Sequence, residues 1–169
     1  MNRGVYFLLG YMGCGKSTWG PLLAKALEVQ FIDLDQEIEK HLCTTITCFF
    51  HEQGEDAFRK VESMMLRKVS SQEGVLISTG GGTPCFEDNM LYMNKVGKTL
   101  YLKVPLEVLH HRLFNQRSER PVLSPLSDKE LFSFIQNQVA NREVFYNQAN
   151  LILPHNASME EWLHLIEEI

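Results

Sequence analysis

Residues 5–18 read VYFLLGYMGCGKST. The apolar run Val5–Leu9 predicts a buried strand, and the segment directly behind it, Gly10 to Ser17, matches the pattern G-x-x-x-x-G-K-[ST]. Glycines let the backbone curl until successive N–H groups point at phosphate oxygens, and the positive N-terminal end of the next helix adds to that attraction. A turn that only packs a strand against a helix has no need of a lysine and a serine at this spacing. The stretch therefore predicts a nucleotide phosphate site between a strand and a helix.

The side chains of this loop have separate tasks. Lys16 supplies a mobile positive charge, and the Ser17 hydroxyl is a suitable ligand for a Mg²⁺ ion that bridges the terminal phosphates. We expect contacts to the nucleotide from Gly13, Cys14, Gly15, Lys16, Ser17 and Thr18. Because Cys14 lies beside a helix N-terminus, the sequence leaves open whether its thiol can be alkylated when no nucleotide is bound.

Length and composition limit the class of protein. A chain of 169 residues with 44% hydrophobic residues can bury a core, and we expect a single domain over residues 1–169. Sixteen basic and twenty-one acidic residues give a formal charge of -5, which argues against a nucleic-acid-binding surface. No apolar run reaches membrane-spanning length, and residues 5–9 are too few for a secretory signal. The four cysteines form no C-x-x-C pair, so we interpret them as reduced thiols of a cytoplasmic protein. We expect a monomer without nucleic-acid or membrane partners.

Strands and helices alternate along the chain. Strands are predicted at 5–9, 29–32, 75–78, 99–102 and 151–153, and helices at 18–27, 36–42, 55–70, 86–96, 106–114, 128–149 and from 158 onward. A further short helix is expected between a cap at Thr45 and a break at Gly54. This alternation predicts an α/β fold of three layers, αβα, with a five-stranded parallel sheet and helices on both faces. Residues 115–127 have no periodicity, and a polar loop of this length is usually functional, so we expect a mobile lid there.

Two carboxylates, Asp33 and Asp35, follow the second predicted strand. Residues two apart in an extended strand end point the same way, so both can face the ligand crevice at the carboxyl edge of the sheet. One carboxylate can then hold the magnesium shell while the other accepts a proton from an attacking hydroxyl. The alternative is structural, with Asp35 as a helix N-cap and Asp33 as a turn residue.

Three arginines, Arg59, Arg120 and Arg142, are candidates for anion binding, although their spacing alone cannot distinguish them from surface residues. Guanidinium groups can capture a substrate carboxylate in a bidentate manner, or neutralise charge on a transferred phosphoryl group. Arg59 and Glu62 are three apart on a predicted helix, close enough to pair. The run Gly80–Gly82 after the third strand indicates that another group approaches the main chain closely.

Along nearly its whole length the chain resembles the shikimate kinases. The matching pieces are Gly10–Gly20, Asp33-Leu34-Asp35, Phe58-Arg59 with Glu62, Gly80–Gly82, Arg120-Pro121, and Arg142 followed by Tyr146. Each of the five pieces after the first is too short to identify a family by itself, but all five in the right order are specific. The resemblance implies a P-loop kinase fold that uses ATP and Mg²⁺ to phosphorylate the 3-hydroxyl of shikimate, on the pathway to chorismate and the aromatic amino acids.

The resemblance also implies a role for each matching residue. Lys16 and Ser17 would handle the phosphates and magnesium, Asp33 would assist the metal, and Asp35 would bind and deprotonate the attacking hydroxyl. The substrate carboxylate would be held by Arg59 and Arg142, with Gly80, Gly81 and Gly82 contributing main-chain contacts and Glu62 orienting Arg59. Arg120 would move in with the lid to reach the phosphates, and Arg112 would lie against the adenine. The implied catalytic residues are thus Asp35, Lys16 and Arg120.

Three other functions would also use a phosphate-binding loop: a gluconate kinase, a nucleotide kinase and a nucleotide-dependent switch. A gluconate kinase would also need to grip a carboxylate, and a nucleotide kinase would need a pocket for a second base. A nucleotide-dependent switch would have no use for Asp35, Arg59 and Arg142 together. The glycine run favours shikimate among these alternatives.

Overall fold

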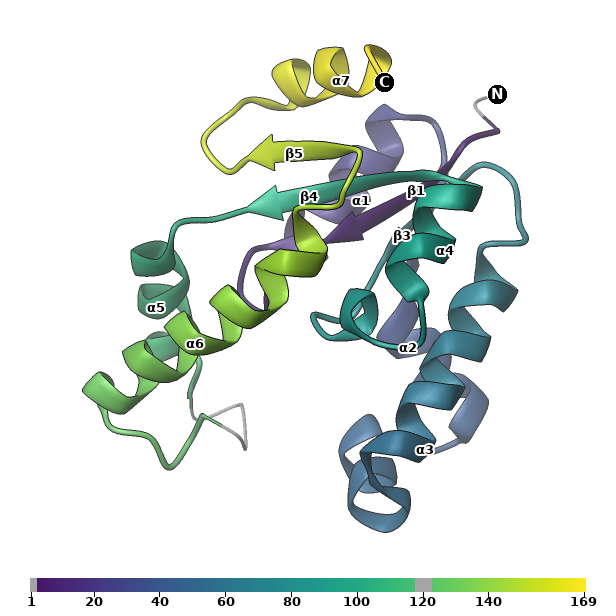
Figure 1. Ribbon diagram of the computed structural model, residues 1–169. Coiled ribbons are helices and arrows are strands. Elements are labelled where there is room, and N and C mark those ends of the chain that lie inside the picture. Colours follow the sequence, from purple (N-terminus) through teal and green to yellow (C-terminus); the bar gives the residue numbers. More distant parts are fainter. Residues whose placement is uncertain (1–2, 118–122) are drawn as a thin grey trace.

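A computed structural model describes residues 3–117 and 123–169 of the chain. Its strands form one five-stranded sheet in the order β2-β3-β1-β4-β5, and every neighbouring pair is parallel. Helices cover both faces of this sheet, so the predicted three-layer αβα architecture with a five-stranded parallel sheet is confirmed (Figure 1). The strands are β1 (Val5–Leu9), β2 (Gln30–Asp33), β3 (Val75–Ser78), β4 (Lys98–Lys103) and β5 (Leu151–Pro154).

The helices are close to their predicted positions. Thr45 caps its helix as expected, by accepting a hydrogen bond from the backbone N–H of Cys48, and Gly54 interrupts that helix with φ 80° and ψ 172°. The helix predicted to begin at residue 86 begins instead at Asn89, after a short 3-10 turn, η1 (Thr83–Cys85). The α-helices are α1 (Lys16–Ala26), α2 (Leu34–Leu42), α3 (Ile46–Val69), α4 (Asn89–Val96), α5 (Leu106–Asn115), α6 (Asp128–Tyr146) and α7 (Met159–Glu167).

Side-chain alternation in the strands builds two separate cores. In β1, Tyr6 and Leu8 face one side of the sheet, where they join buried residues of α1, α5, α6 and α7. Phe7 and Leu9 face the other side and join buried residues of α2, α3 and α4. The nearly continuous apolar sequence of β1 thus reflects burial on both faces, as is usual in parallel sheets.

The strand register aligns the loops that carry the candidate site. Leu8 lies beside Ser78 of β3, and Ser78 lies beside Asp33 of β2, so these three strands end at the same edge. The chain leaves this edge as the glycine-rich loop after β1, as α2 after β2, and as Gly80–Gly82 after β3. Ligands of open α/β sheets bind outside the carboxyl ends of the strands, and this edge is therefore the candidate site.

Candidate active site

The glycine-rich loop after β1 curls as the sequence predicted. Gly13 and Gly15 have φ values of 78° and 107°, which other residues rarely adopt, and Gly15 is the N-cap of α1. Within the described part of the chain, no side chain caps this end of α1, so its positive end faces the cavity described below. Nζ of Lys16 donates to the main-chain oxygens of Gly10 (2.6 Å) and Tyr11 (3.3 Å), which places the ammonium group inside the curl.

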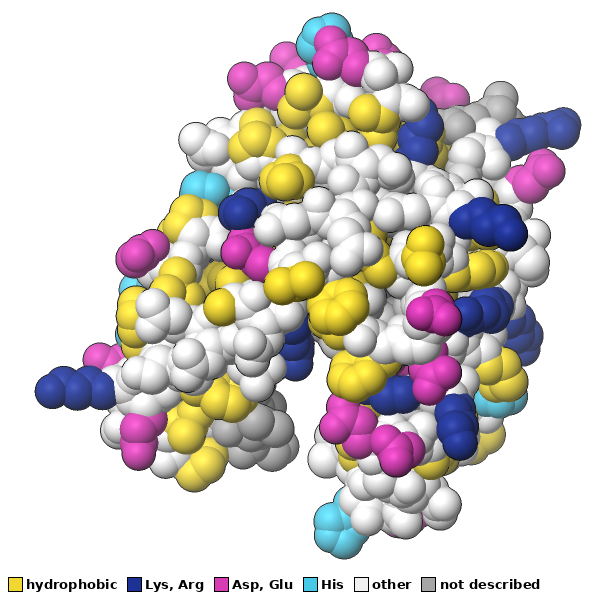
Figure 2. Space-filling model, in the orientation of Figure 1, with side chains coloured by type: hydrophobic (Ala, Val, Ile, Leu, Met, Phe, Trp, Pro, Cys, Tyr) yellow, Lys and Arg dark blue, Asp and Glu magenta, His cyan; other side chains and the backbone are white. Residues whose placement is uncertain are grey.

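Most of the predicted nucleotide and metal residues line a single cavity of about 680 Å³. In Figure 2 the molecule is deeply hollowed between the part that contains α5 and α6 and the part that contains α3. Of the residues predicted from sequence, the cavity is lined by Gly13, Gly15, Lys16, Ser17, Thr18, Asp33, Asp35, Gly80, Gly81 and Arg112. Cys14 does not line it, because its side chain is buried in the core at 2% exposure.

Asp33 and Asp35 both line this cavity, but not because they lie in an extended strand end, as the sequence analysis predicted. Asp33 ends β2 and is the N-cap of α2, where its Oδ1 accepts a hydrogen bond of 3.2 Å from the Gln36 N–H. Asp35 lies in the first turn of α2. The prediction that both residues are extended was therefore wrong, and so was the alternative that made Asp35 the cap. A helix that starts directly at the strand end turns Asp35 toward the crevice.

Asp35 has the electrostatics of a proton acceptor. It is exposed to the cavity, yet the surrounding protein removes much of its water, and the Asp33 and Glu62 carboxylates add repulsion. Partial burial and these like charges raise the pKa of Asp35 to about 6, against the opposing effect of Lys16. A carboxylate with a pKa near the working pH combines the charged form with useful basicity, as a general base requires.

Each glycine of the run Gly80–Gly82 faces a different candidate side chain. None has a φ in the left-handed region, so space rather than backbone freedom explains the glycines. A Cβ atom at Gly80 would lie 3.0 Å from Oδ1 of Asp35, and one at Gly81 would lie 3.2 Å from Nη1 of Arg142. One at Gly82 would lie 2.8 Å from Nη2 of Arg59. The run thus brings together three residues from α2, α3 and α6.

Arg59 is held in place by two carboxylates, as the sequence predicted for one of them. Its Nη1 donates to Oε2 of Glu62 at 2.8 Å, and its Nη2 donates to Oε1 of Glu55 at 2.9 Å. Burial opposes the cation, but these carboxylates outweigh it and raise the pKa of Arg59 above its usual value. The guanidinium also lies 4.1 Å from the centre of the Phe86 ring. Arg59 is therefore a fixed cation rather than a mobile surface residue.

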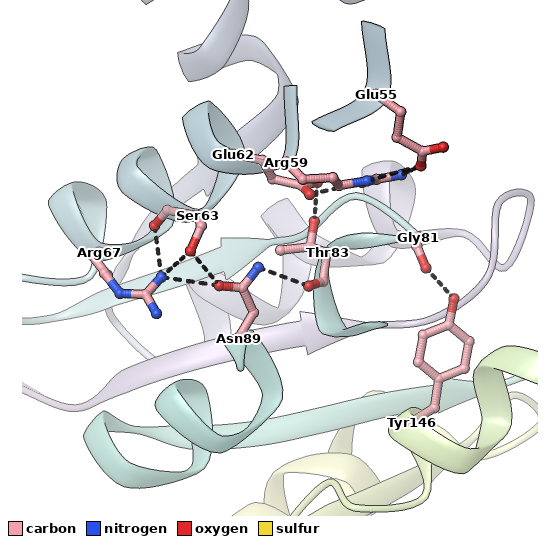
Figure 3. A network of polar contacts seen from close by, with 9 residues as sticks. All are labelled: Glu55, Arg59, Glu62, Ser63, Arg67, Gly81, Thr83, Asn89 and Tyr146. Carbon is pink, nitrogen blue, oxygen red and sulfur yellow. Dashed lines mark hydrogen bonds and ion pairs between the residues drawn. The ribbon is translucent and has the colours of Figure 1, made fainter. Parts of the chain in front are cut away.

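Arg142 lies on the other side of the glycine run. Its guanidinium is 5.3 Å from the centre of the Tyr11 ring, in the loop after β1. One helical turn further along α6, the buried Tyr146 hydroxyl donates to the main-chain oxygen of Gly81 (Figure 3). Burial raises the pKa of Tyr146, so this hydroxyl stays protonated and available as a donor. Helix α6 therefore carries Arg142 and, through Tyr146, holds the main chain of Gly81.

The remaining predicted residues are Arg112, on α5, and Arg120, in the segment 115–127 that was predicted to be a lid. Nη1 of Arg112 donates to the main-chain oxygens of Gly13 (3.1 Å) and Cys14 (3.0 Å), so this arginine lies against the glycine-rich loop and lines the cavity beside it. Arg120 lies outside the described residues, as does the whole segment 118–122 of the predicted lid 115–127. Leu123, at its far end, is fully buried in the core.

The oxygen atoms of Ser17 and Asp33 are suitable ligands for Mg²⁺ and line the same cavity. The residues placed by the structure include no group of three or more His, Cys, Asp or Glu side chains that could hold a metal ion. Such a sparse set fits Mg²⁺, which keeps several waters and is commonly held by one or two protein ligands together with substrate phosphates. Over the described ranges, no helix is long and apolar enough to cross a membrane.

Some residues of the site were not singled out from the sequence. Met12, Trp19, Thr79 and Gln116 also line the cavity, and Thr83 lies directly behind the glycine run with its hydroxyl bonded to Glu62. The sequence signal that could have identified Thr83 is its position directly after three glycines. Tyr146 was noted only as part of a resemblance, although its spacing of four from Arg142 places the two on one helix face.

Comparisons with known proteins agree with this geometry. A family model described as shikimate kinase matches residues 12–168. A shikimate kinase of Bacteroides fragilis is 49% identical over 146 residues, covering 86% of this chain and 82% of that protein. The crystal structure of shikimate kinase from Bacteroides thetaiotaomicron has a TM-score of 0.92 and 42% identity, covering 98% of this chain and 99% of that one. A shikimate kinase from Acinetobacter baumannii, solved in complex with shikimate, has a TM-score of 0.86 and 28% identity, covering 98% of this chain and 94% of that one. The chain therefore belongs to the shikimate kinase family.

Proposed function

We propose that the cavity between the glycine-rich loop and the Gly80–Gly82 run is the place where this kinase transfers phosphate from ATP to shikimate. As a member of the shikimate kinase family, the protein is an enzyme that phosphorylates shikimate with ATP. The observation that carries the assignment of residues is the arrangement of Asp35, Arg142 and Arg59 along three successive glycines. Gly80, Gly81 and Asp35 line the cavity together with Lys16, whereas Gly82, Arg59 and Arg142 lie beside it and are not part of its lining. The carboxylate can accept a proton from a substrate hydroxyl, and the two guanidinium groups can bind a substrate carboxylate. The glycines between them leave room for a small ligand that carries both groups.

In this proposal Asp35 is the general base. Its carboxylate accepts the proton of the 3-hydroxyl as the oxygen attacks the terminal phosphate of ATP, in line with the leaving oxygen of ADP. Lys16 contributes positive charge to the transferred group, since phosphoryl transfer depends on positioning and charge more than on covalent help. Ser17 and Asp33 would hold Mg²⁺, which when bound offsets the charge of the phosphate oxygens.

The substrate carboxylate would bind between Arg59 and Arg142. The two guanidinium groups flank neighbouring glycines, so a carboxylate over the main chain of Gly81 and Gly82 can reach both. The relative from Acinetobacter baumannii was solved with shikimate, which supports a substrate of this chemistry here. Gluconate would offer a carboxylate too, but its open chain would not fix the reacting hydroxyl relative to that carboxylate as a ring does.

Arg112 and Arg120 complete the nucleotide side. Arg112 already lies against the glycine-rich loop and would pack on the adenine, while Arg120 would reach the phosphates when residues 115–127 close as a lid. Closure would exclude water, and ATP hydrolysis would otherwise compete with transfer. We also propose that residues 1–169 act as one domain and as a monomer in the cytoplasm. The four free cysteines are consistent with a reducing compartment, and light scattering would test the monomer.

The test is a comparison of phosphate acceptors. Purified protein is incubated with ATP and Mg²⁺, and ADP release is followed with shikimate, gluconate or nucleoside monophosphates in separate reactions. Release that depends on shikimate is the expected result, and release with gluconate alone would contradict the proposal. Omitting Mg²⁺ and adding a chelator should stop the reaction.

A further inference from the structure

Behind the glycine run lies a buried network of polar side chains, none of which lines the cavity. It contains Glu62 (1% exposed), Ser63 (8%), Thr83 (0%) and Asn89 (0%), together with Arg67. Figure 3 shows these side chains between α3 and the segment that leads into α4, with Arg59 at one end. Buried polar groups are costly unless they are paired, so a network of this size has a structural or positional role.

Thr83 occupies the central place in this network. Its hydroxyl donates to Oε1 of Glu62 at 2.6 Å, and the other oxygen of Glu62 accepts from Nη1 of Arg59 at 2.8 Å. Each oxygen of the Glu62 carboxylate therefore has its own hydrogen-bond donor. These two bonds fix the orientation of the carboxylate relative to the Arg59 guanidinium. A Cβ atom at Gly80 would lie 3.1 Å from Oγ1 of Thr83 and 3.3 Å from Oε1 of Glu62, so this pair packs directly against Gly80 in space that a side chain there would occupy.

Thr83 is itself held by the remainder of the network. Nδ2 of Asn89 donates to its main-chain oxygen at 3.0 Å, and Oδ1 of Asn89 accepts from Ser63 (2.8 Å) and Arg67 (3.0 Å). The N–H of Thr83 donates to the main-chain oxygen of Gly80 at 3.2 Å. The hydroxyl of Thr83 is therefore presented to Glu62 by a rigid segment rather than by a mobile loop.

We propose that Thr83 is a positioning residue for substrate binding, which acts by holding Glu62 so that Glu62 aims Arg59 at the substrate carboxylate. This inference rests on the proposed role of Arg59. The Arg59 side chain is only 12% exposed, so a ligand can reach only part of the guanidinium. The orientation of the guanidinium therefore decides whether it can bind the substrate carboxylate. Without the hydroxyl, Glu62 keeps its charge but can rotate, so Nη1 of Arg59 loses its fixed partner and the guanidinium is oriented only by Glu55, which holds Nε and Nη2.

The decisive measurement separates substrate affinity from turnover. Thr83→Val keeps the shape of the side chain and removes the hydroxyl. Because Arg59 contacts the same carboxylate before and during transfer, the KM for shikimate should rise by about tenfold, with kcat and the KM for ATP changed far less. Thr83→Ser should restore the KM for shikimate to within about twofold of the wild type, because it restores the donor. Thr83→Ala, which adds no atom, should behave as Thr83→Val does and serves if the valine variant does not fold.

A matched control is available at the opposite edge of the sheet. Thr99, at the start of β4, is also fully buried, and its hydroxyl is hydrogen-bonded to Asn94 and Asn150. Thr99→Val should lower the thermal unfolding midpoint without raising the KM for shikimate. A purely structural role for Thr83 would give the same pattern in Thr83→Val, and that result would overturn the inference.

A double-mutant cycle tests the route through Arg59. In an Arg59→Lys background the planar fork is absent, so Thr83→Val should raise the KM for shikimate by a smaller factor than in the wild type. Equal factors in both backgrounds would show that Thr83 acts independently of Arg59 and would refute the proposal. Failure of the proposed function is distinguishable, because it would appear in the wild type as ADP release that does not depend on shikimate.

Discussion

Replacing Asp35 by asparagine should strongly reduce turnover and at the same time stabilise the protein at neutral pH. Partial burial, with the Asp33 and Glu62 carboxylates nearby, raises the pKa of Asp35 from 3.8 to about 6. An acid with a raised pKa favours folding while it is protonated, and this contribution is lost as the pH rises through the folded-state pKa. The wild type should therefore lose stability relative to Asp35→Asn between about pH 4 and pH 7.

The structure also limits the size of this effect. A pKa difference of about two between the folded and unfolded chains corresponds to roughly 3 kcal/mol at about 1.4 kcal/mol per unit of pKa. Asp35 is exposed to the cavity, so solvent screening reduces the expected change to on the order of 1 kcal/mol. Turnover should fall by a factor of about 100 or more, as is typical when a general base is removed.

Urea unfolding of both proteins at about pH 4.5 and about pH 7.5 measures the difference. Glu37→Gln is the control, because Glu37 lies in the same first turn of α2 and its loss removes an equal charge from the helix N-terminus. It also removes the Lys40–Glu37 ion pair (2.6 Å), which is solvent-exposed and contributes little to stability. Comparing the two variants isolates the cavity carboxylate from the helix-end effect. If Asp35→Asn were less stable than the wild type by the same amount at both pH values, or kept full turnover, the reasoning would be refuted.

Three further substitutions test other parts of the site. Arg142→Ala should raise the KM for shikimate and leave ATP affinity nearly intact in a binding titration, because in the proposed site Arg142 contacts only the substrate; a collapse of nucleotide binding would show that Arg142 is wrongly assigned. Lys16→Ala should slow transfer by about 100-fold or more with an unchanged circular dichroism spectrum, and an unaffected rate would contradict its role. Gly82→Ala should raise the KM for shikimate, since the new Cβ would lie 2.8 Å from Nη2 of Arg59; unchanged kinetics would mean that Arg59 has room to move.

Local patterns in the sequence were sufficient for the architecture. The apolar run at 5–9, the strand at 75–78 and the cap at Thr45 all match the structure, because burial on both faces and capping depend on neighbouring residues. The ends of the elements were predicted less accurately than their existence. The helix expected from residue 86 starts at Asn89, because Glu87 and Asp88 adopt left-handed conformations (φ 51° and 53°) that interrupt helical geometry.

Some features of the site follow from neighbouring residues in the sequence, and others follow only from the tertiary structure. The sequence by itself determined the phosphate loop, since Gly13, Gly15 and Lys16 act within a few residues of one another and their spacing carries the chemistry. Only the tertiary structure decided which side of the crevice Asp35 faces, because that depends on where α2 begins. It also decided that Arg59 and Arg142, 83 positions apart (142 minus 59), meet at neighbouring glycines, and that Thr83 holds Glu62. Such contacts depend on strand register and helix packing, which no short stretch of sequence contains.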